Sequence, residues 1–163
     1  IRERVRWLRD AIPDLVLRTT IIVGFPGETE EEFEEMLALL EEIRFDRLGA
    51  FLYSVEEGTP AAEMDGQVPE SVKNERLERV MDLQRSISLE KNEAKVGGEV
   101  TVLVDEAAGE DGVEAIGRTA GQAFEIDGVT ILQGADGIRP GTFVRARIVE
   151  ALEDDLVAEV IER

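Results

Sequence analysis

The segment best suited to chemistry is the run TTIIVGFPGET, from Thr19 to Thr29. An apolar strand leads there into a Gly-Phe-Pro-Gly turn, and parallel α/β sheets bind ligands at the carboxyl ends of their strands. Gly24 and Gly27 have no Cβ, so a flat ring or a ribose can approach the main chain closely. The glycines alone favour an ordinary strand-to-helix turn, since a single GxxG spacing is weak evidence of a site.

Charged residues around this turn have simpler interpretations. The acidic run from Glu28 to Glu35 is interpreted as a solvated helix face with favourable charge near the helix N-terminus, without a catalytic role. Arg18 begins the same strand as Ile22 and needs a partner, for which a structural glutamate is favoured over a cofactor carboxylate.

The residue types that are missing exclude whole classes of site. The chain contains no Cys and no His. By itself it therefore cannot hold an iron–sulfur cluster or a Cys/His zinc ion, run a His-based catalytic triad or form a disulfide. We expect no metal ligands and no catalytic residues in this chain.

Composition indicates a folded, acidic protein. The 163 residues are 43% apolar, which suits one domain or two small ones. With 18 basic and 37 acidic side chains the formal charge is −19, which argues against coating a phosphate backbone and suits basic partners. No apolar run approaches the length of a membrane span and no signal peptide is present, so we expect a soluble, cytoplasmic protein without a membrane partner.

The elements that must position the glycine turn follow a β–α rhythm. Pro13 ends a first predicted helix, whose apolar stripe must face a partner surface and consists of Ile1, Val5, Leu8 and Ile12. Residues 15–23 predict a strand buried on both faces, as in parallel sheets. A second helix starts with a capping box formed by Thr29 and Glu32. A second strand is predicted over residues 46–54, so the fold class is α/β with crossover helices.

A change from helical periodicity to strand-like alternation marks a predicted domain boundary. Pro69 opens a long helix over residues 70–95, which Gly97 and Gly98 stop. Its core-facing stripe is expected to consist of Val72, Leu77, Val80, Met81 and Ile87. We therefore predict two domains, over residues 1–96 and 97–163.

The second domain alternates apolar and polar residues with a period of two, as strands do. Five short strands are expected, at Val100–Asp105, Val113–Arg118, Gly128–Leu132, Phe143–Glu150 and Leu156–Ile161. They fit a small five-stranded antiparallel OB-like β-barrel better than a flat sheet with exposed edges. This domain holds five basic and fifteen acidic residues, a net charge of −10. Its acidity is denser than that of residues 1–96.

Three longer strings carry a resemblance. IIVGFPGETEEEF, FDRLGAFLYSVEEGTPAA and VPESVKNERLERVMDLQRSIS resemble the C-terminal half of the radical-SAM methylthiotransferases, and GRTAGQAFEIDGV resembles the TRAM barrel that closes those enzymes. The resemblance covers essentially the whole chain. It implies the C-terminal part of a partial parallel βα (TIM-like) barrel over residues 1–96, followed by a TRAM β-barrel.

The resemblance also implies an S-adenosylmethionine site. The GFPGET strand corresponds to the family strand that lies against the adenine, so Ile22 and Val23 supply apolar contact and Gly24 permits close approach. At the end of the next strand, Leu52, Tyr53 and Ser54 are expected to offer backbone groups to the adenine edge; Tyr53 is also interpreted as a core or rim residue. The sequence departs from the G-x-I-x-G-x-x-E pattern, because Thr20 replaces the first Gly and Glu28 comes one position late. Glu28 is therefore expected to act as helix-capping charge.

The family holds two 4Fe-4S clusters through cysteines that this chain lacks. We therefore expect a fragment that is inactive alone, lacking an N-terminal domain and the first strands of the partial barrel.

Two substrate branches compete. One adds a methylthio group to the β-carbon of an aspartate in the small-subunit ribosomal protein S-twelve, and the other modifies an adenosine in tRNA. The acidic barrel and Glu56-Glu57 favour the basic ribosomal protein over tRNA. A non-catalytic adaptor that binds a basic protein is the alternative from another class. Single-stranded nucleic-acid binding ranks last, because Phe124 and Phe143 are the only aromatic residues in the barrel.

Overall fold

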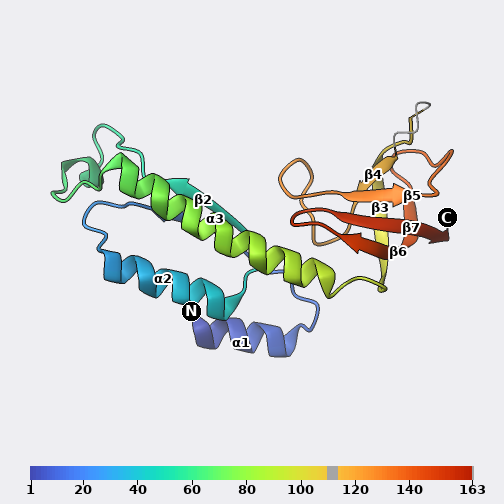
Figure 1. Ribbon diagram of the computed structural model, residues 1–163, viewed down its shortest axis with the longest axis horizontal. Helices are drawn as coiled ribbons and strands as arrows, with labels where there is room; N and C mark the ends of the chain where they lie inside the picture. Colours follow the sequence, from blue (N-terminus) through green and yellow to red (C-terminus); the bar gives the residue numbers. More distant parts are fainter. Residues whose placement is uncertain (110–113, 163) are drawn as a thin grey trace. The chain divides into compact units, whose positions relative to one another are not determined.

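The computed structural model describes residues 1–109 and 114–162 and divides the chain into two compact units, Ile1–Ile87 and Ser88–Arg163. Figure 1 shows the helices α1, α2 and α3 and the strand β2 in the first unit, and a β-barrel in the second. The division falls within the long helix α3 (Glu70–Glu93).

The first unit contains two parallel strands, β1 (Arg18–Val23) and β2 (Arg47–Leu52), joined by the crossover helix α2 (Glu30–Ile43). The predicted capping box is confirmed: the Thr29 side chain accepts from the Glu32 N–H, and the Glu32 carboxylate accepts from the Thr29 N–H. A short 3-10 helix, η1 (Pro60–Glu63), precedes α3. The strand pair confirms the predicted α/β rhythm.

The core of this unit lies between one face of the strand pair and the helices α2 and α3. It is centred on Val23, Phe33, Leu40 and Val80. The prediction that the first strand is buried on both faces is wrong, because its exposure alternates and Val23 alone is buried. The helices cover only one face of the strands, so the side chains on the opposite face are accessible.

The predicted helical stripes differ in how far they are buried. No residue of α1 (Arg2–Ala11) is buried. On α3, Val80 and Ile87 are buried as predicted, whereas Val72, Leu77 and Met81 are only partly buried. Part of the buried surface of α3 is instead polar, and consists of Lys73, Arg76, Gln84, Ser88 and Asn92. Apolar periodicity does not detect such a face.

The second unit is a closed barrel with the strand order β3-β4-β5-β7-β6. The strands, yellow to red in Figure 1, are β3 (Glu99–Glu106), β4 (Ala115–Arg118), β5 (Thr130–Gln133), β6 (Phe143–Ala151) and β7 (Leu156–Glu162). The five strands confirm the predicted barrel; Val113, the predicted start of the second strand, lies outside the described residues. Alternate side chains point inward into a core that includes Val102, Leu132, Val144, Ile148 and Leu156.

The prediction of an antiparallel barrel is wrong at one pair. β5 and β7 run parallel, with Thr130 opposite Leu156, whereas the other four pairs are antiparallel. After β5 the chain crosses to the far edge of β3, where it pairs as β6, and β7 then fills the gap between β5 and β6. Period-two alternation shows which side chains point inward but not which strands pair, so the sequence pattern misses this connection.

Candidate functional site at the carboxyl ends of two strands

The structure brings most of the sequence-predicted site residues together. In the parallel register Ile22 lies opposite Phe51 and Val23 lies opposite Leu52. The Tyr53 N–H continues the pairing by donating to the Val23 carbonyl at 2.9 Å. The carboxyl ends of β1 and β2 therefore form one edge, where ligands of parallel α/β sheets bind.

The two faces of this edge differ in character. Ile22 and Phe51 are 56% and 62% exposed, and they form an apolar surface with the backbone of Gly49. Val23 is fully buried in the core and Leu52 packs against the same core. The open face can contact a ligand through Ile22 and Phe51, whereas the side chain of Val23 points away from it. Phe51 was missed in the sequence, although its place two residues before Tyr53 on the strand is a usable signal.

The glycine turn has a fixed backbone. Gly24 and Gly27 have φ angles of +76° and +84°, which L side chains rarely adopt. The Gly27 N–H donates to the Gly66 carbonyl at 2.9 Å, and the Glu28 N–H donates to the Phe25 carbonyl at 2.9 Å. A Cβ at Gly24 would lie 2.4 Å from Cγ of Lys73. The space that Gly24 leaves is therefore filled by the stem of Lys73.

The expected role of Glu28 as helix-capping charge is not what the structure shows. Glu28 Oε1 accepts from the Gly24 N–H at 2.9 Å and from Nη1 of Arg76 at 2.6 Å. Arg76 also donates to the Glu28 carbonyl at 3.2 Å and to Glu30 Oε2 at 3.0 Å. The bond from Arg76 to Glu30, and then the bond from Arg79 to Glu30 Oε1 at 3.0 Å, hold the pKa of Glu30 below its usual value. Glu28 thus connects the glycine turn to α3.

A second cation from α3 reaches the end of β2. Lys73 Nζ donates to the Tyr53 carbonyl at 2.9 Å and lies 5.4 Å from the centre of the Tyr53 ring. The Tyr53 ring also makes an edge-on contact with Phe25, with centroids 5.3 Å apart. The Tyr53 hydroxyl is buried, and within the described residues it has no hydrogen-bond partner. Ser54 is exposed.

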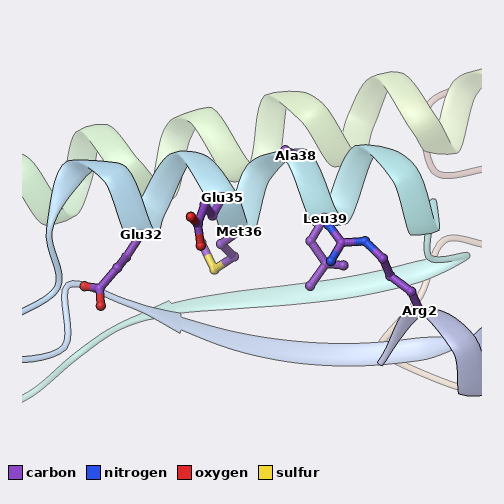
Figure 2. Close-up of a pocket in the computed structure, with 6 residues that line it drawn as sticks. All are labelled: Arg2, Glu32, Glu35, Met36, Ala38 and Leu39. Carbon is purple, nitrogen blue, oxygen red and sulfur yellow. The ribbon is translucent and has the colours of Figure 1, made fainter.

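A cavity of about 570 Å³ lies elsewhere in the first unit, on α2 beside α1 (Figure 2). Its lining consists of Arg2, Glu32, Glu35, Met36, Ala38 and Leu39. None of the predicted site residues lines it, and Glu32 is already engaged in the capping box. The strand ends, rather than this cavity, remain the candidate site.

The arginines of strands β4 and β6 are paired with carboxylates. Arg145 contacts both Glu99 and Glu162, and Arg147 donates to Glu99 Oε1 at 3.0 Å. The bond from Arg147, then that from Arg145, keeps the pKa of Glu99 below its usual value. Arg118 pairs with Asp105 and lies 4.8 Å from the centre of the exposed Phe124 ring. These three arginines therefore have their charges offset by neighbouring carboxylates.

The string GRTAGQAFEIDGV has a structural role in the barrel. The buried Gln122 accepts from the Thr119 N–H and the Thr130 hydroxyl, each at 2.8 Å, and donates to the Gly128 carbonyl at 2.8 Å. One amide side chain thus joins both ends of the loop that precedes β5. Buried and fully bonded, Gln122 is a part of the scaffold rather than a ligand contact.

Within the described ranges 1–109 and 114–162, no group of His, Cys, Asp or Glu is arranged to hold a metal ion. A search of the same residues finds no helix that is long and apolar enough to cross a membrane.

The similarity to known proteins extends over both units of the chain. The TRAM-domain family model matches residues 96–161. The ribosomal protein uS12 methylthiotransferase RimO of Desulforudis audaxviator is 52% identical over 161 residues, which are 99% of this chain and 35% of that protein. Nearly the whole chain is thus similar in sequence to a protein of this name. The proteins of the same name from Methylobacillus flagellatus and Anaeromyxobacter sp. strain K are each 50% identical, over 95% and 100% of this chain. The chain spans about a third of the length of these relatives.

Proposed function

We propose that the chain is the C-terminal third of a radical-SAM enzyme that adds a methylthio group to an aspartate of ribosomal protein uS12. The observation that carries this proposal is about 50% identity to uS12 methylthiotransferases along nearly the whole chain. In this proposal β1 and β2 are strands of a partial TIM-like barrel, and their open face is part of its interior. The TRAM match from residue 96 supports a domain boundary between residues 96 and 97.

The strand ends fit a nucleoside. We propose that Ile22 contacts the adenine of S-adenosylmethionine, because its exposed side chain lies beside Phe51 on an apolar face. Backbone groups of Gly24, Leu52, Tyr53 and Ser54 are assigned to the rim of this site. Val23 supports it from the core side. When bound, S-adenosylmethionine supplies the methyl group of the product.

The two 4Fe-4S clusters do not fit residues of this chain. Cluster ligands are cysteine thiolates, and the chain contains none. In the proposed enzyme these ligands belong to other segments, so the chain alone is expected to be inactive.

We assign uS12 to the barrel as its partner on electrostatic grounds. Residues 97–163 carry a net charge of −10, which attracts a basic protein and repels a polyanion. The arginines of β4 and β6 do not reverse this sign, because each is paired with a carboxylate. A tRNA substrate and a non-catalytic adaptor are the competing functions.

A chimera tests the reaction. Residues 1–163 replace the matching segment of the Desulforudis audaxviator relative, and the product is incubated with uS12 or with tRNA. We expect a mass increase on uS12 only. Modification of tRNA would overturn the substrate, and an inactive chimera alongside an active relative would favour the adaptor.

Charge reversal on the barrel tests the partner. Asp136, Glu150 and Glu153 are exposed, so changing each to Lys leaves the described hydrogen bonds intact. We expect the triple variant to lose binding to uS12 at low salt. Asp155 is unsuitable for this test because its carboxylate accepts from the Val129 N–H at 2.7 Å. Unchanged binding, or capture of tRNA, would contradict the assignment.

A further inference from the structure

We propose that Lys73 and Arg76, one helical turn apart on α3, are positioning residues that fix the two strand ends of the nucleoside site. The inference rests on the proposed function, since it assigns a role toward the S-adenosylmethionine that the strand ends would hold. It concerns residues that no sequence pattern singled out.

Arg76 fixes the end of β1 through Glu28. Its side chain is 6% exposed and donates to Glu28 Oε1 at 2.6 Å, and that same oxygen accepts from the Gly24 N–H at 2.9 Å. The chain Arg76–Glu28–Gly24 thus ends on the backbone of the residue where β1 meets the site. Hydrogen bonds with a charged partner are shorter and stronger than neutral ones, so this contact constrains Gly24.

Lys73 fixes the end of β2. Its Nζ donates to the Tyr53 carbonyl at 2.9 Å, and its stem fills the space beside Gly24. Lys73 therefore contacts both strand ends at once. We expect this side chain to restrict the movement of Tyr53 relative to Gly24.

Burial argues that these cations do more than stabilise the fold. As whole residues Lys73 and Arg76 are both buried, and Arg76 lies against the ring of Phe33 in the apolar core. Buried ion pairs generally add little net stability compared with well-packed apolar residues. Both cations are instead connected to the backbone of the strand ends, Lys73 directly at the Tyr53 carbonyl and Arg76 through the Glu28 carboxylate that accepts from the Gly24 N–H.

The chain offers a matched control in Arg79. Its guanidinium lies 4.8 Å from the centre of the Phe33 ring, as that of Arg76 does at 5.1 Å. Arg79 also binds Glu30 and contacts Glu34, but none of its described bonds reaches Glu28 or Gly24. Loss of Arg79 removes the same charge from the same ring without touching the strand end, although its side chain is 35% exposed and that of Arg76 only 6%.

Hydrogen exchange at the Gly24 amide tests the contact in the 163-residue chain. We expect exchange roughly tenfold faster in Arg76→Gln than in Arg79→Gln, because only the first change frees the Glu28 carboxylate. If Arg76→Gln does not fold, Arg76→Lys takes its place, with a smaller effect in the same direction. Equal Gly24 exchange in the Arg76 and Arg79 variants would overturn the proposal.

Cofactor affinity tests the consequence in the chimera. S-adenosylmethionine binding, measured by calorimetry, is expected to weaken about tenfold or more with Arg76→Gln or Lys73→Met and to be unchanged with Arg79→Gln. Wild-type affinity in the Arg76 and Lys73 variants would overturn the positioning role. If the unsubstituted chimera binds no S-adenosylmethionine, the proposed function fails, and faster Gly24 exchange alone then decides whether the contact exists.

Discussion

At the scale of single residues, the absence of a Cβ at Gly24 allows the side chain of Lys73 to pack against the glycine turn. Two independent constraints apply there, a left-handed backbone and the stem of Lys73 in the place of a side chain. Gly27 also has a left-handed backbone, but no described atom beyond its neighbours lies within 4 Å of the position that a Cβ would take there. A substitution at Gly27 therefore tests backbone strain alone, whereas one at Gly24 tests strain together with steric crowding by Lys73.

We predict that Gly27→Ala lowers the free energy of unfolding by about 1 kcal/mol, from backbone strain alone. Gly24→Ala is expected to add a further loss of about 1–3 kcal/mol, because Lys73 must move. Urea unfolding followed by circular dichroism measures both variants. Equal losses would show that Lys73 yields freely and that crowding at Gly24 is unimportant.

The residues that could be predicted from sequence are those whose signal is local. The positions of Ile22, Gly24 and Tyr53 on neighbouring strand ends follow from the order of strand, turn and helix. Arg76 could not be found in this way, because it lies 48 residues after its partner Glu28 and because arginine is a residue type that usually faces solvent. The polar part of the site is a tertiary arrangement.

At the scale of elements, helix α2 begins where the sequence predicts. Its capping box has both reciprocal bonds, Glu32 N–H to Thr29 Oγ1 at 3.2 Å and Thr29 N–H to Glu32 Oε2 at 3.0 Å. We predict that Thr29→Ala lowers the free energy of unfolding by about 1 kcal/mol. The exposed Glu31, which belongs to the same turn but not to the box, provides the control Glu31→Gln, measured by thermal unfolding. Equal effects of the two changes would argue against the box as the source of stability.

Strands β3, β6 and β7 share an acid-sensitive group of charges. Hydrogen bonds from Arg147 and Arg145 lower the pKa of Glu99 from its ordinary value of 4.5. A lowered pKa in the folded state means that the interaction stabilises above the ordinary value and is lost as the pH falls through the lowered one.

We therefore predict that Glu99→Gln makes the barrel less stable at neutral pH and that the difference from the parent chain shrinks below about pH 4.5. Thermal unfolding across an acid pH series measures this difference. Because Glu99 is exposed, the effect should be small and should weaken in high salt. A difference that is constant with pH would contradict the assignment.

The positions of the barrel strands in the sequence could be predicted from the alternation of apolar and polar residues, but which strands pair with each other could not. Phe143 and Leu156 start strands close to where the sequence pattern starts them. The parallel partner of β7 is determined by the path of the chain between β5 and β6, and that path depends on closure of the barrel. Pairing of this kind is a property of the assembled sheet.

At the scale of the whole molecule, the open face of the strand pair leaves large apolar side chains exposed. Ile22 and Phe51 lie side by side and are more than half exposed. Contiguous apolar surface of this kind favours association. We predict that the 163-residue chain self-associates as its concentration rises and that Phe51→Ser reduces this association.

Sedimentation velocity over a concentration series measures the effect. Phe143→Ser, which removes a similarly exposed aromatic residue from the barrel, is the control. If the Phe143 variant reduces association and the Phe51 variant does not, the chain self-associates through the barrel and not through the strand pair.

The parallel contact between β5 and β7 has a kinetic consequence. β5 and β6 follow each other along the chain but leave a slot one strand wide, and β7 alone fills it. The barrel cannot close by forming hairpins one after another along the chain. Its closure requires β7 to pair with β5, from which it is separated in sequence by β6. Refolding should therefore wait on the arrival of residues 156–162, so that weakening this strand slows acquisition of the native state more than weakening β4 does.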